Sequence, residues 1–193
     1  MNQVADLPFS IDIETGLMCE AKRIMSPNCD ERPKNEPISL VVVHGISLPP
    51  NQFGGQGVEQ LFTNQINPEE HPYYKNLEGL KVSAHLFIRR DGEIIQFVPF
   101  NKRAWHAGVS EFKGQERCND FSIGIELEGT DDIAYTEIQY QVLAKSIKAL
   151  WQAYPDLKMD NVVGHSDIAP GRKTDPGVAF SWETLRCLLD RQA

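Results

Sequence analysis

The stretch ISLVVVH, residues 38–44, is the part of the sequence from which the fold can best be predicted. Its four residues from Leu40 to Val43 are all apolar, and three of them are β-branched. A continuous apolar run of this length predicts a buried central strand rather than one with a solvent-exposed face. Such a strand needs neighbouring strands beside it and helices above and below it, and both are expected elsewhere in the chain.

Four more strands are predicted from apolar patterns and turn signals. Residues 82–90 and 93–99 flank Asp91-Gly92, a pair that is typical of a β-hairpin turn. Residues 121–129 alternate isoleucine and leucine with serine, glycine and glutamate, which predicts a half-buried strand with one small or acidic face. Residues 161–165, with the sequence NVVGH, predict another short strand.

Two helices are predicted from apolar residues at helical spacing. Residues 136–154 begin with Thr136 and Gln139, which can form a capping box, and continue with an apolar stripe. Residues 181–191 predict the last helix, with Ser181 as its N-cap. Strands and helices therefore intermix along the chain, which predicts a mixed α/β fold with a central mixed β-sheet flanked by helices.

One domain is expected from the length of 193 residues, which is enough to bury a sizeable core. We expect this domain to span residues 1–193, with residues 1–25 as an N-terminal extension that packs on it. The glycine- and proline-rich stretch 49–57 and the segment 67–79 are predicted to be loops.

The composition excludes several classes of protein. A net charge of −8 argues against a general nucleic-acid binder, which normally presents a basic face. We find no signal peptide and no apolar run long enough to span a membrane, so we expect a cytoplasmic protein. The four cysteines lie far apart, without a C-x-x-C pair, and free thiols are expected.

Two of the five histidines share a local context that is suited to metal binding. His44 and His165 each close an apolar strand and precede a polar loop, and Asp175 follows in the second loop. Two imidazoles and one carboxylate leave a position open for water, which is the composition of a catalytic zinc site. The alternative is that each histidine is simply a hydrogen-bonded core or surface residue. Non-haem iron also suits these ligands, but its usual H-x-D pattern needs a later histidine, and none follows His165.

Three charged residues are candidates for the chemistry of such a site. Lys173 lies two residues before Asp175, so in an extended segment the two side chains point the same way and the ammonium could stabilise an oxyanion. Glu126 and Glu128 share the sparse face of the strand at 121–129, where a partly dry cleft would suit a general base. An exposed turn lysine and two solvent-facing glutamates on an edge strand are the alternatives, and composition does not separate them.

Four long motifs resemble those of a known family and occur in the same order. They are VVVHGISLPP (41–50), KVSAHLFIRRDGEIIQFVPFNKRAWHAGVS (81–110), GQERCNDFSIGIELEGTD (114–131) and GHSDIAPGRKTDPG (164–177). The chain resembles the zinc-dependent N-acetylmuramoyl-L-alanine amidases of the peptidoglycan-recognition fold. It is most similar to the cytoplasmic branch that acts on 1,6-anhydro-muropeptides in cell-wall recycling.

The resemblance implies a role for each matching residue. The zinc (Zn²⁺) ligands would be His44, His165 and Asp175. The catalytic residues would be Glu126 and Lys173, and the substrate contacts would be Arg117, Lys81 and Trp105. His106 would only orient its loop, and Gly45 departs from the asparagine that is expected after the first ligand in close relatives.

The implied reaction is hydrolysis of the amide between the lactyl group of (1,6-anhydro)N-acetylmuramic acid and L-alanine of the stem peptide. The expected partner is this small-molecule substrate, with no nucleic acid and no membrane, and we expect a monomer. A non-catalytic muropeptide sensor of the same fold is the alternative, although sensors typically lack a zinc ligand. An exported amidase that acts on intact peptidoglycan is a third hypothesis.

Overall fold

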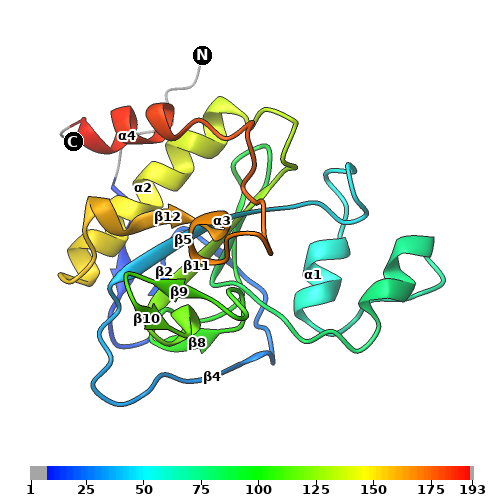
Figure 1. Cartoon of the computed structure of the whole chain (residues 1–193), viewed down its shortest axis with the longest axis horizontal. Helices are drawn as coiled ribbons and strands as arrows, with labels where there is room; N and C mark the ends of the chain where they lie inside the picture. The colour runs from blue at the N-terminus through cyan, green and yellow to red at the C-terminus, as the bar shows by residue number, and fades with distance from the viewer. Residues whose placement is uncertain (1–7, 192–193) are drawn as a thin grey trace.

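A six-stranded sheet that contains β5 (Leu40–Ile46) forms the framework of the protein. The computed structural model describes residues 8–191. Figure 1 shows the sheet with helices packed on it. In their order across the sheet, the strands are β12 (Val162–Gly164), β5, β11 (Ser122–Glu128), β6 (Leu86–Ile88), β7 (Ile94–Gln96) and β3 (Lys22–Arg23).

The sheet is mixed, as the sequence predicts. β5, β11, β12 and β6 run parallel to one another, whereas β7 pairs antiparallel with β6. The β6–β7 pair is the predicted hairpin around Asp91-Gly92, with Gly92 at φ 90° in its turn. Both strands are shorter than predicted, since residues 82–85 precede β6 without joining it.

The prediction that residues 121–129 form a half-buried strand is wrong. β11 lies between β5 and β6, and all seven of its residues are buried. Its two faces still differ, because the isoleucines and leucine pack under the helices while the serine, glycine and glutamates face the other side. The same correction removes the interpretation of Glu126 and Glu128 as solvent-facing residues of an edge strand.

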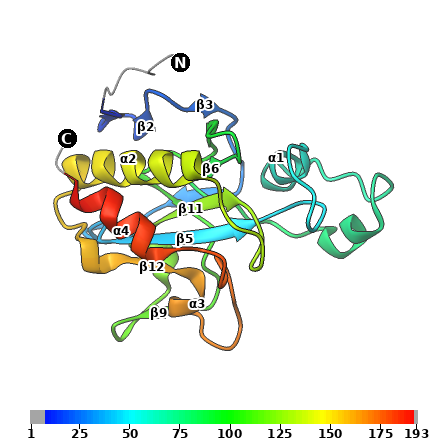
Figure 2. The ribbon, with the colours of Figure 1, turned by 90° about the horizontal axis from the view of Figure 1, so that it is seen from above.

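The two predicted helices cover one face of this sheet. α2 (Glu137–Ala153) begins with the expected capping box, in which Thr136 and Gln139 exchange hydrogen bonds. α4 (Trp182–Asp190) begins at Ser181, whose Oγ accepts a hydrogen bond from the amide of Thr184. Apolar residues of both helices join one core cluster with every second residue of β5 and β11. Figure 2 shows α2 and the one-turn helix α3 (His165–Ile168) on opposite sides of the sheet.

Short elements surround the opposite face and the edges. α1 (Gly57–Phe62) and the 3₁₀ helix η1 (Pro72–Leu77) project at the right of Figure 1, so the segment predicted as loop at 67–79 contains a helical turn. The remaining elements are three two-stranded ribbons and two 3₁₀ turns: β1 (Ile11–Asp12) with β2 (Leu17–Met18), β4 (Cys29–Glu31) with β8 (Lys102–Ala104), β9 (Glu111–Phe112) with β10 (Gln115–Glu116), η2 (Cys118–Asp120) and η3 (Met159–Asn161).

The N-terminal segment is tied to the sheet by a buried glutamine. Gln96 in β7 accepts a hydrogen bond from the amide of Met18 at 2.8 Å and donates one to the carbonyl of Gly16 at 2.9 Å. Met18 is fully buried, and β3 pairs parallel with β7 at the edge of the sheet. We propose that residues 8–25 are an integral part of the domain; residues 1–7 of the expected extension lie outside the described residues.

Replacing Gln96 with leucine therefore tests this attachment. The variant leaves the buried amide of Met18 without its partner, which costs about 1–3 kcal/mol, whereas the carbonyl of Gly16 still accepts a hydrogen bond from the amide of Phe100 at 2.8 Å. We expect urea denaturation to show a loss of that order and proteases to cut the N-terminal segment sooner. Gln141→Leu, on an exposed face of α2, is the control and should change stability by less than about 0.5 kcal/mol. Equal stability of the two variants would contradict the attachment.

Candidate metal centre and active site

Three parallel strands bring the candidate residues to one level of the sheet. Glu126 of β11 pairs with His44 of β5, and Gly164 of β12 pairs with Val43, so His165 follows at the level of His44. His44 does not close its strand as predicted, because β5 continues to Ile46, and His165 is already the first residue of α3. The candidates still meet, because they lie near the carboxyl ends of adjacent parallel strands, where α/β proteins bind ligands.

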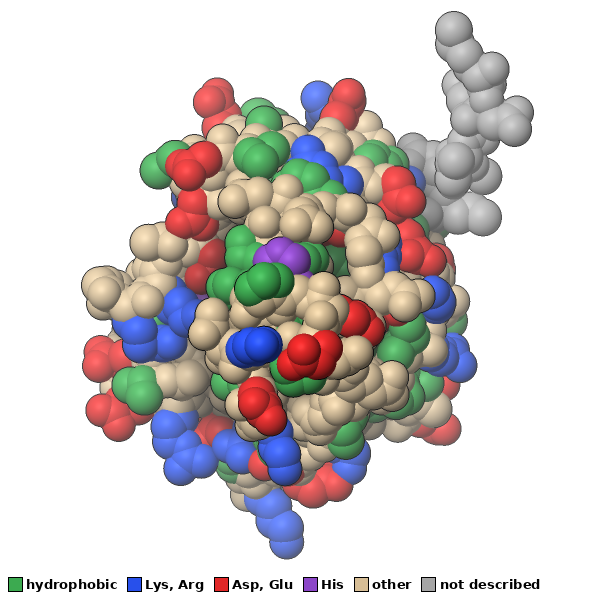
Figure 3. Space-filling model, turned by 90° about the vertical axis from the view of Figure 1, so that its right-hand side faces the viewer, with side chains coloured by type: hydrophobic (Ala, Val, Ile, Leu, Met, Phe, Trp, Pro, Cys, Tyr) green, Lys and Arg blue, Asp and Glu red, His purple; other side chains and the backbone are tan. Residues whose placement is uncertain are grey.

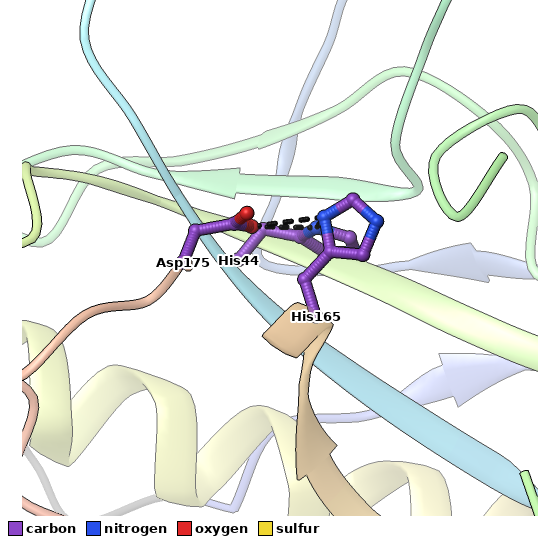
Figure 4. A group of neighbouring side chains, drawn as sticks. All are labelled: His44, His165 and Asp175. Carbon is purple, nitrogen blue, oxygen red and sulfur yellow. Dashed lines mark hydrogen bonds and ion pairs between the residues drawn. The ribbon is translucent and has the colours of Figure 1, made fainter. Parts of the chain in front are cut away.

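His44, His165 and Asp175 form a tight triangle of potential ligand atoms. The Nδ1 atoms of the two histidines lie 3.0 Å apart, and Asp175 Oδ2 lies 3.1 Å from one and 3.0 Å from the other. Figure 4 shows the carboxylate directed at both rings. The two histidines are only 1% and 3% exposed, so the triangle is shielded from bulk water.

The second nitrogen of each histidine is already engaged. His165 Nε2 lies 3.1 Å from the carbonyl of Ala107, and because a carbonyl only accepts, the ring proton belongs on Nε2. His44 Nε2 lies 2.9 Å from Nδ1 of His106. His165 therefore presents a free lone pair on Nδ1 to the triangle, which is the form that binds a metal.

Burial and hydrogen bonding adjust the charges of the triangle. Burial lowers the pKa of His44 to about 4, even though its hydrogen bond to Asp175 acts in the opposite direction. Burial alone would raise the pKa of Asp175, but its close contacts with His165 and His44 lower it well below its ordinary value. At neutral pH the site therefore holds a neutral His44 imidazole and an ionised carboxylate.

This donor set fits a divalent metal ion. The three atoms lie within 4.8 Å of one another, and ligands of a tetrahedral zinc with bonds of about 2.0–2.1 Å would be about 3.3 Å apart. The ionised carboxylate of Asp175 also brings a negative charge, which a cation would offset. The fit rests on the positions and chemistry of these side chains, since the structure carries no ions.

Glu126 and Glu128 lie on the same face of β11 but have different partners. Glu128 accepts hydrogen bonds from the backbone amides of Gly54 and Arg90, at 2.5 and 3.1 Å, so it anchors the loop after β5 and the hairpin turn. Glu126 is directed at the triangle, with Oε1 4.0 Å from His44 Nδ1, and its buried Oε2 has no partner. The structure thus separates two glutamates that the strand pattern left equivalent.

The environment of Glu126 suits a proton acceptor. Burial raises its pKa well above the ordinary value, and the charge of Asp175 raises it further, while Lys173 partly offsets both. A raised pKa means that a proton taken by this carboxylate is held more firmly than in water.

Lys173 reaches the site by a different route from the one predicted. Residues 173 and 174 belong to no strand, so the argument from extended spacing does not apply. Lys173 is exposed, but its charge acts on both His44 and Glu126, lowering the pKa of each. Lys173 therefore brings a positive charge close enough to act on the triangle and on Glu126.

The three predicted substrate contacts lie in different places. Arg117 lines a hollow of about 750 Å³ together with Arg172 and the loop 108–111. Lys81 lines a separate hollow of about 230 Å³ beside α1, so the structure does not group it with Arg117. Trp105 is half-buried and directly precedes His106.

The sequence reasoning missed how closely His106 joins the site. Its ring bridges His44 and Ser122, at 2.9 and 3.0 Å, rather than only orienting a loop. A Cβ on Gly124 would lie 2.4 Å from Cγ of His106, so a glycine on β11 is needed to admit this ring. The sequence signal for this contact is Gly124 in the pattern Ser-Ile-Gly-Ile, since a glycine within a strand can mark the close approach of another group.

The departure at Gly45 also has a physical reason. A Cβ there would lie 2.2 Å from the hydroxyl of Tyr135, which donates a hydrogen bond of 2.9 Å to the carbonyl of Pro176. Tyr135 therefore occupies the space of a side chain at position 45 and supports the backbone that follows Asp175.

The surface agrees with the charge balance of the sequence. On the face shown in Figure 3, which carries α1, basic and acidic side chains intermingle rather than forming one basic surface.

Within residues 8–191, none of the helices has the length and apolar character to cross a membrane. All four cysteines are free thiols, as expected.

Comparison with known proteins gives consistent results. The family model for N-acetylmuramoyl-L-alanine amidase matches residues 34–178. The 1,6-anhydro-N-acetylmuramyl-L-alanine amidase AmpD of Escherichia coli K12 is 57% identical over 180 residues, covering 93% of this chain and 98% of that protein. The AmpD of Citrobacter freundii is also 57% identical, over 92% of this chain and 94% of its own length.

A solved structure supports the fold over nearly the same range. The crystal structure of a selenomethionine AmpD derivative superimposes with a TM-score of 0.89 at 57% identity, covering 93% of this chain and 98% of that one. AMPDH3 from Pseudomonas aeruginosa, solved in complex with anhydromuramic pentapeptide, has a TM-score of 0.62 at 29% identity over 86% of this chain and 66% of its own. The chain therefore belongs to the N-acetylmuramoyl-L-alanine amidase family.

Proposed function

We propose that this chain is a zinc-dependent amidase that cleaves the bond between 1,6-anhydro-N-acetylmuramic acid and L-alanine of the stem peptide. The observation that carries the proposal is the buried triangle of His44, His165 and Asp175 beside a glutamate with an unpartnered oxygen. The high identity to amidases named for the 1,6-anhydro substrate supports the choice of substrate.

His44 Nδ1, His165 Nδ1 and Asp175 Oδ2 would hold the metal. When bound, zinc lowers the pKa of a coordinated water and polarises the carbonyl of the scissile amide. The protein shields this reaction from bulk water, because both histidines are buried and Asp175 is 15% exposed.

Glu126 would move the proton. Its free Oε2 is available to take a proton from the attacking water and then to deliver it to the departing amine of L-alanine. Its raised pKa favours the protonated intermediate form, which is needed for the second transfer.

Lys173 and the basic residues nearby would act on the substrate. The Lys173 ammonium would stabilise the negative charge that develops on the carbonyl oxygen, since its charge already acts on His44 and on Glu126. Arg117 would bind a carboxylate of the stem peptide in the hollow that it shares with Arg172. Trp105 and Lys81 remain proposed substrate contacts.

The resemblance implies that such a reaction takes place in the cytoplasm, where cell-wall fragments are recycled, and we propose that location. The competing hypothesis of an exported enzyme predicts comparable cleavage of intact peptidoglycan. Measuring turnover on anhydro-muropeptide and on purified sacculi separates the two, with a strong preference for the anhydro-muropeptide expected. A zinc-loaded protein that cleaves neither would instead support the sensor.

Replacing Asp175 with alanine should remove metal and activity together. The change takes away one of three ligand atoms and leaves two buried imidazoles. Elemental analysis should find close to one zinc per wild-type chain and much less in the variant. Asp156→Ala, at an exposed loop position, is the control and should keep both zinc and turnover. Full zinc occupancy in Asp175→Ala would remove Asp175 from the ligand set.

Glu126→Gln and Glu128→Gln form a matched pair. Glutamine keeps the size of the side chain at 126 but cannot take the proton, so we expect zinc to be retained and kcat to fall by about 10²–10⁴-fold. At 128 it disturbs the hydrogen bonds to Gly54 and Arg90, so stability should fall more than kcat. Near-normal turnover of Glu126→Gln would refute the proposed proton transfer.

Arg117→Ala should raise KM with little change in kcat. An exposed cation that binds a distant carboxylate contributes equally to the ground and transition states. Lys81→Ala, in the other hollow, should have the smaller effect. Steady-state kinetics on anhydro-muropeptide with a stem tripeptide measures both, and a loss confined to kcat would contradict the binding role of Arg117.

A further inference from the structure

One dipeptide, His106-Ala107, contacts both ligand histidines from behind. The His106 ring lies 2.9 Å from Nε2 of His44, and the Ala107 carbonyl lies 3.1 Å from Nε2 of His165. In each case the contact is made on the nitrogen that faces away from Asp175. The orientation of both imidazoles therefore depends on a single short segment.

A side chain from another element clamps this dipeptide. Oδ1 of Asn119 accepts hydrogen bonds from the backbone amides of His106, at 3.1 Å, and Ala107, at 2.8 Å. Asn119 lies in η2, where the half-buried Arg32 guanidinium donates to the carbonyls of Asn119 and Asp120. The position of the dipeptide is thus set by a network outside the metal triangle.

The His106 ring is also fixed from its other side. It packs against the bare Cα of Gly124, where a Cβ would be only 2.4 Å from its Cγ. Its Nε2 lies 3.0 Å from the hydroxyl oxygen of Ser122, so both ring nitrogens have partners. These contacts therefore fix both the position and the orientation of the His106 ring.

These contacts define a direction for the hydrogen bonds when a metal is bound. His44 would hold the metal through the lone pair on Nδ1, so its ring proton would be on Nε2 and would be donated to Nδ1 of His106. The proton of His106 is then on its own Nε2 and donates to Ser122. Each histidine thus fixes the tautomer of the next, which is how residues behind a metal site tune it.

We propose that His106 is a positioning residue that fixes the tautomer and orientation of His44 for metal binding, and that Asn119 holds it there. The inference rests on the proposed function, because it presumes that the triangle binds zinc. In this proposal it is Nδ1 of His106, as the acceptor of the His44 proton, that matters for zinc binding; an aromatic ring at this position would not be enough.

Three substitutions at one position separate these roles. In His106→Asn, the amide oxygen occupies the place of Nδ1 and can still accept the proton of His44. In His106→Gln, the amide occupies the place of Nε2 and can still reach Ser122, but the acceptor for His44 is lost. In His106→Phe, the ring remains over Gly124 and both polar atoms are lost.

Zinc affinity, measured by competition with a chelator, is the readout. We expect His106→Phe and His106→Gln to bind zinc about 10–100-fold more weakly than the wild type, the usual effect of removing such a partner. His106→Asn should recover most of this loss. Urea denaturation of the metal-free proteins should accompany the measurement, so that affinities are compared only among folded chains.

Asn119 provides a second, independent pair. Asn119→Asp keeps an acceptor for both amides and should bind zinc nearly as tightly as the wild type, whereas Asn119→Leu should bind it more weakly. Nitrogen-15 NMR of the zinc-loaded wild type should show His106 with its proton on Nε2.

The outcomes are distinguishable. Equal zinc affinity in wild type and His106→Phe, or no recovery in His106→Asn, would overturn the positioning role, as would a proton on Nδ1 of His106 in the loaded protein. A wild-type protein that binds no zinc would instead refute the proposed function.

Discussion

The parallel pairing of β5 with β11 and β12 is the constraint on which the rest of the structure depends. Its register places Glu126 opposite His44 and brings His165 to the same level from the other side. Alternation along the strands then sends the apolar residues to α2 and α4 and the polar ones to the opposite face. A shift of one residue in either pairing would exchange the faces and bury the site residues under the helices.

Burial of this polar face, together with the hydrogen-bond partners available there, sets the pKa values of the carboxylates in the site. A carboxylate with two histidine partners is ionised even though it is shielded, whereas a carboxylate without a partner has a raised pKa. Asp175 and Glu126 are therefore suited to different tasks, one to holding a cation and the other to moving a proton. Glu128 is also buried, but its carboxylate accepts hydrogen bonds from backbone amides and so supports the loop around Gly54.

The support of the site extends well beyond the sheet. The segment that contains His106 and Ala107 links the metal triangle to η2, and Arg32 links η2 to the end of the sheet at Ser122. Tyr135 supports the other side through the carbonyl of Pro176. Such a network holds side chains in one geometry before substrate arrives, which is what a preorganised site requires.

Local sequence determined the elements whose signals are local: the apolar run at 38–44, the hairpin turn at Asp91-Gly92 and the capped helices. The metal candidates also followed from local context, because each histidine adjoins an apolar run, and the family motifs assigned their roles. Only the tertiary structure decided that β11 is buried on both faces, since burial depends on which strands pair beside it. The family motifs had selected Glu126 over Glu128, but only the structure gave the physical difference between them and joined His106 and Asn119 to His44, because hydrogen-bond partners distant in sequence leave no periodic pattern.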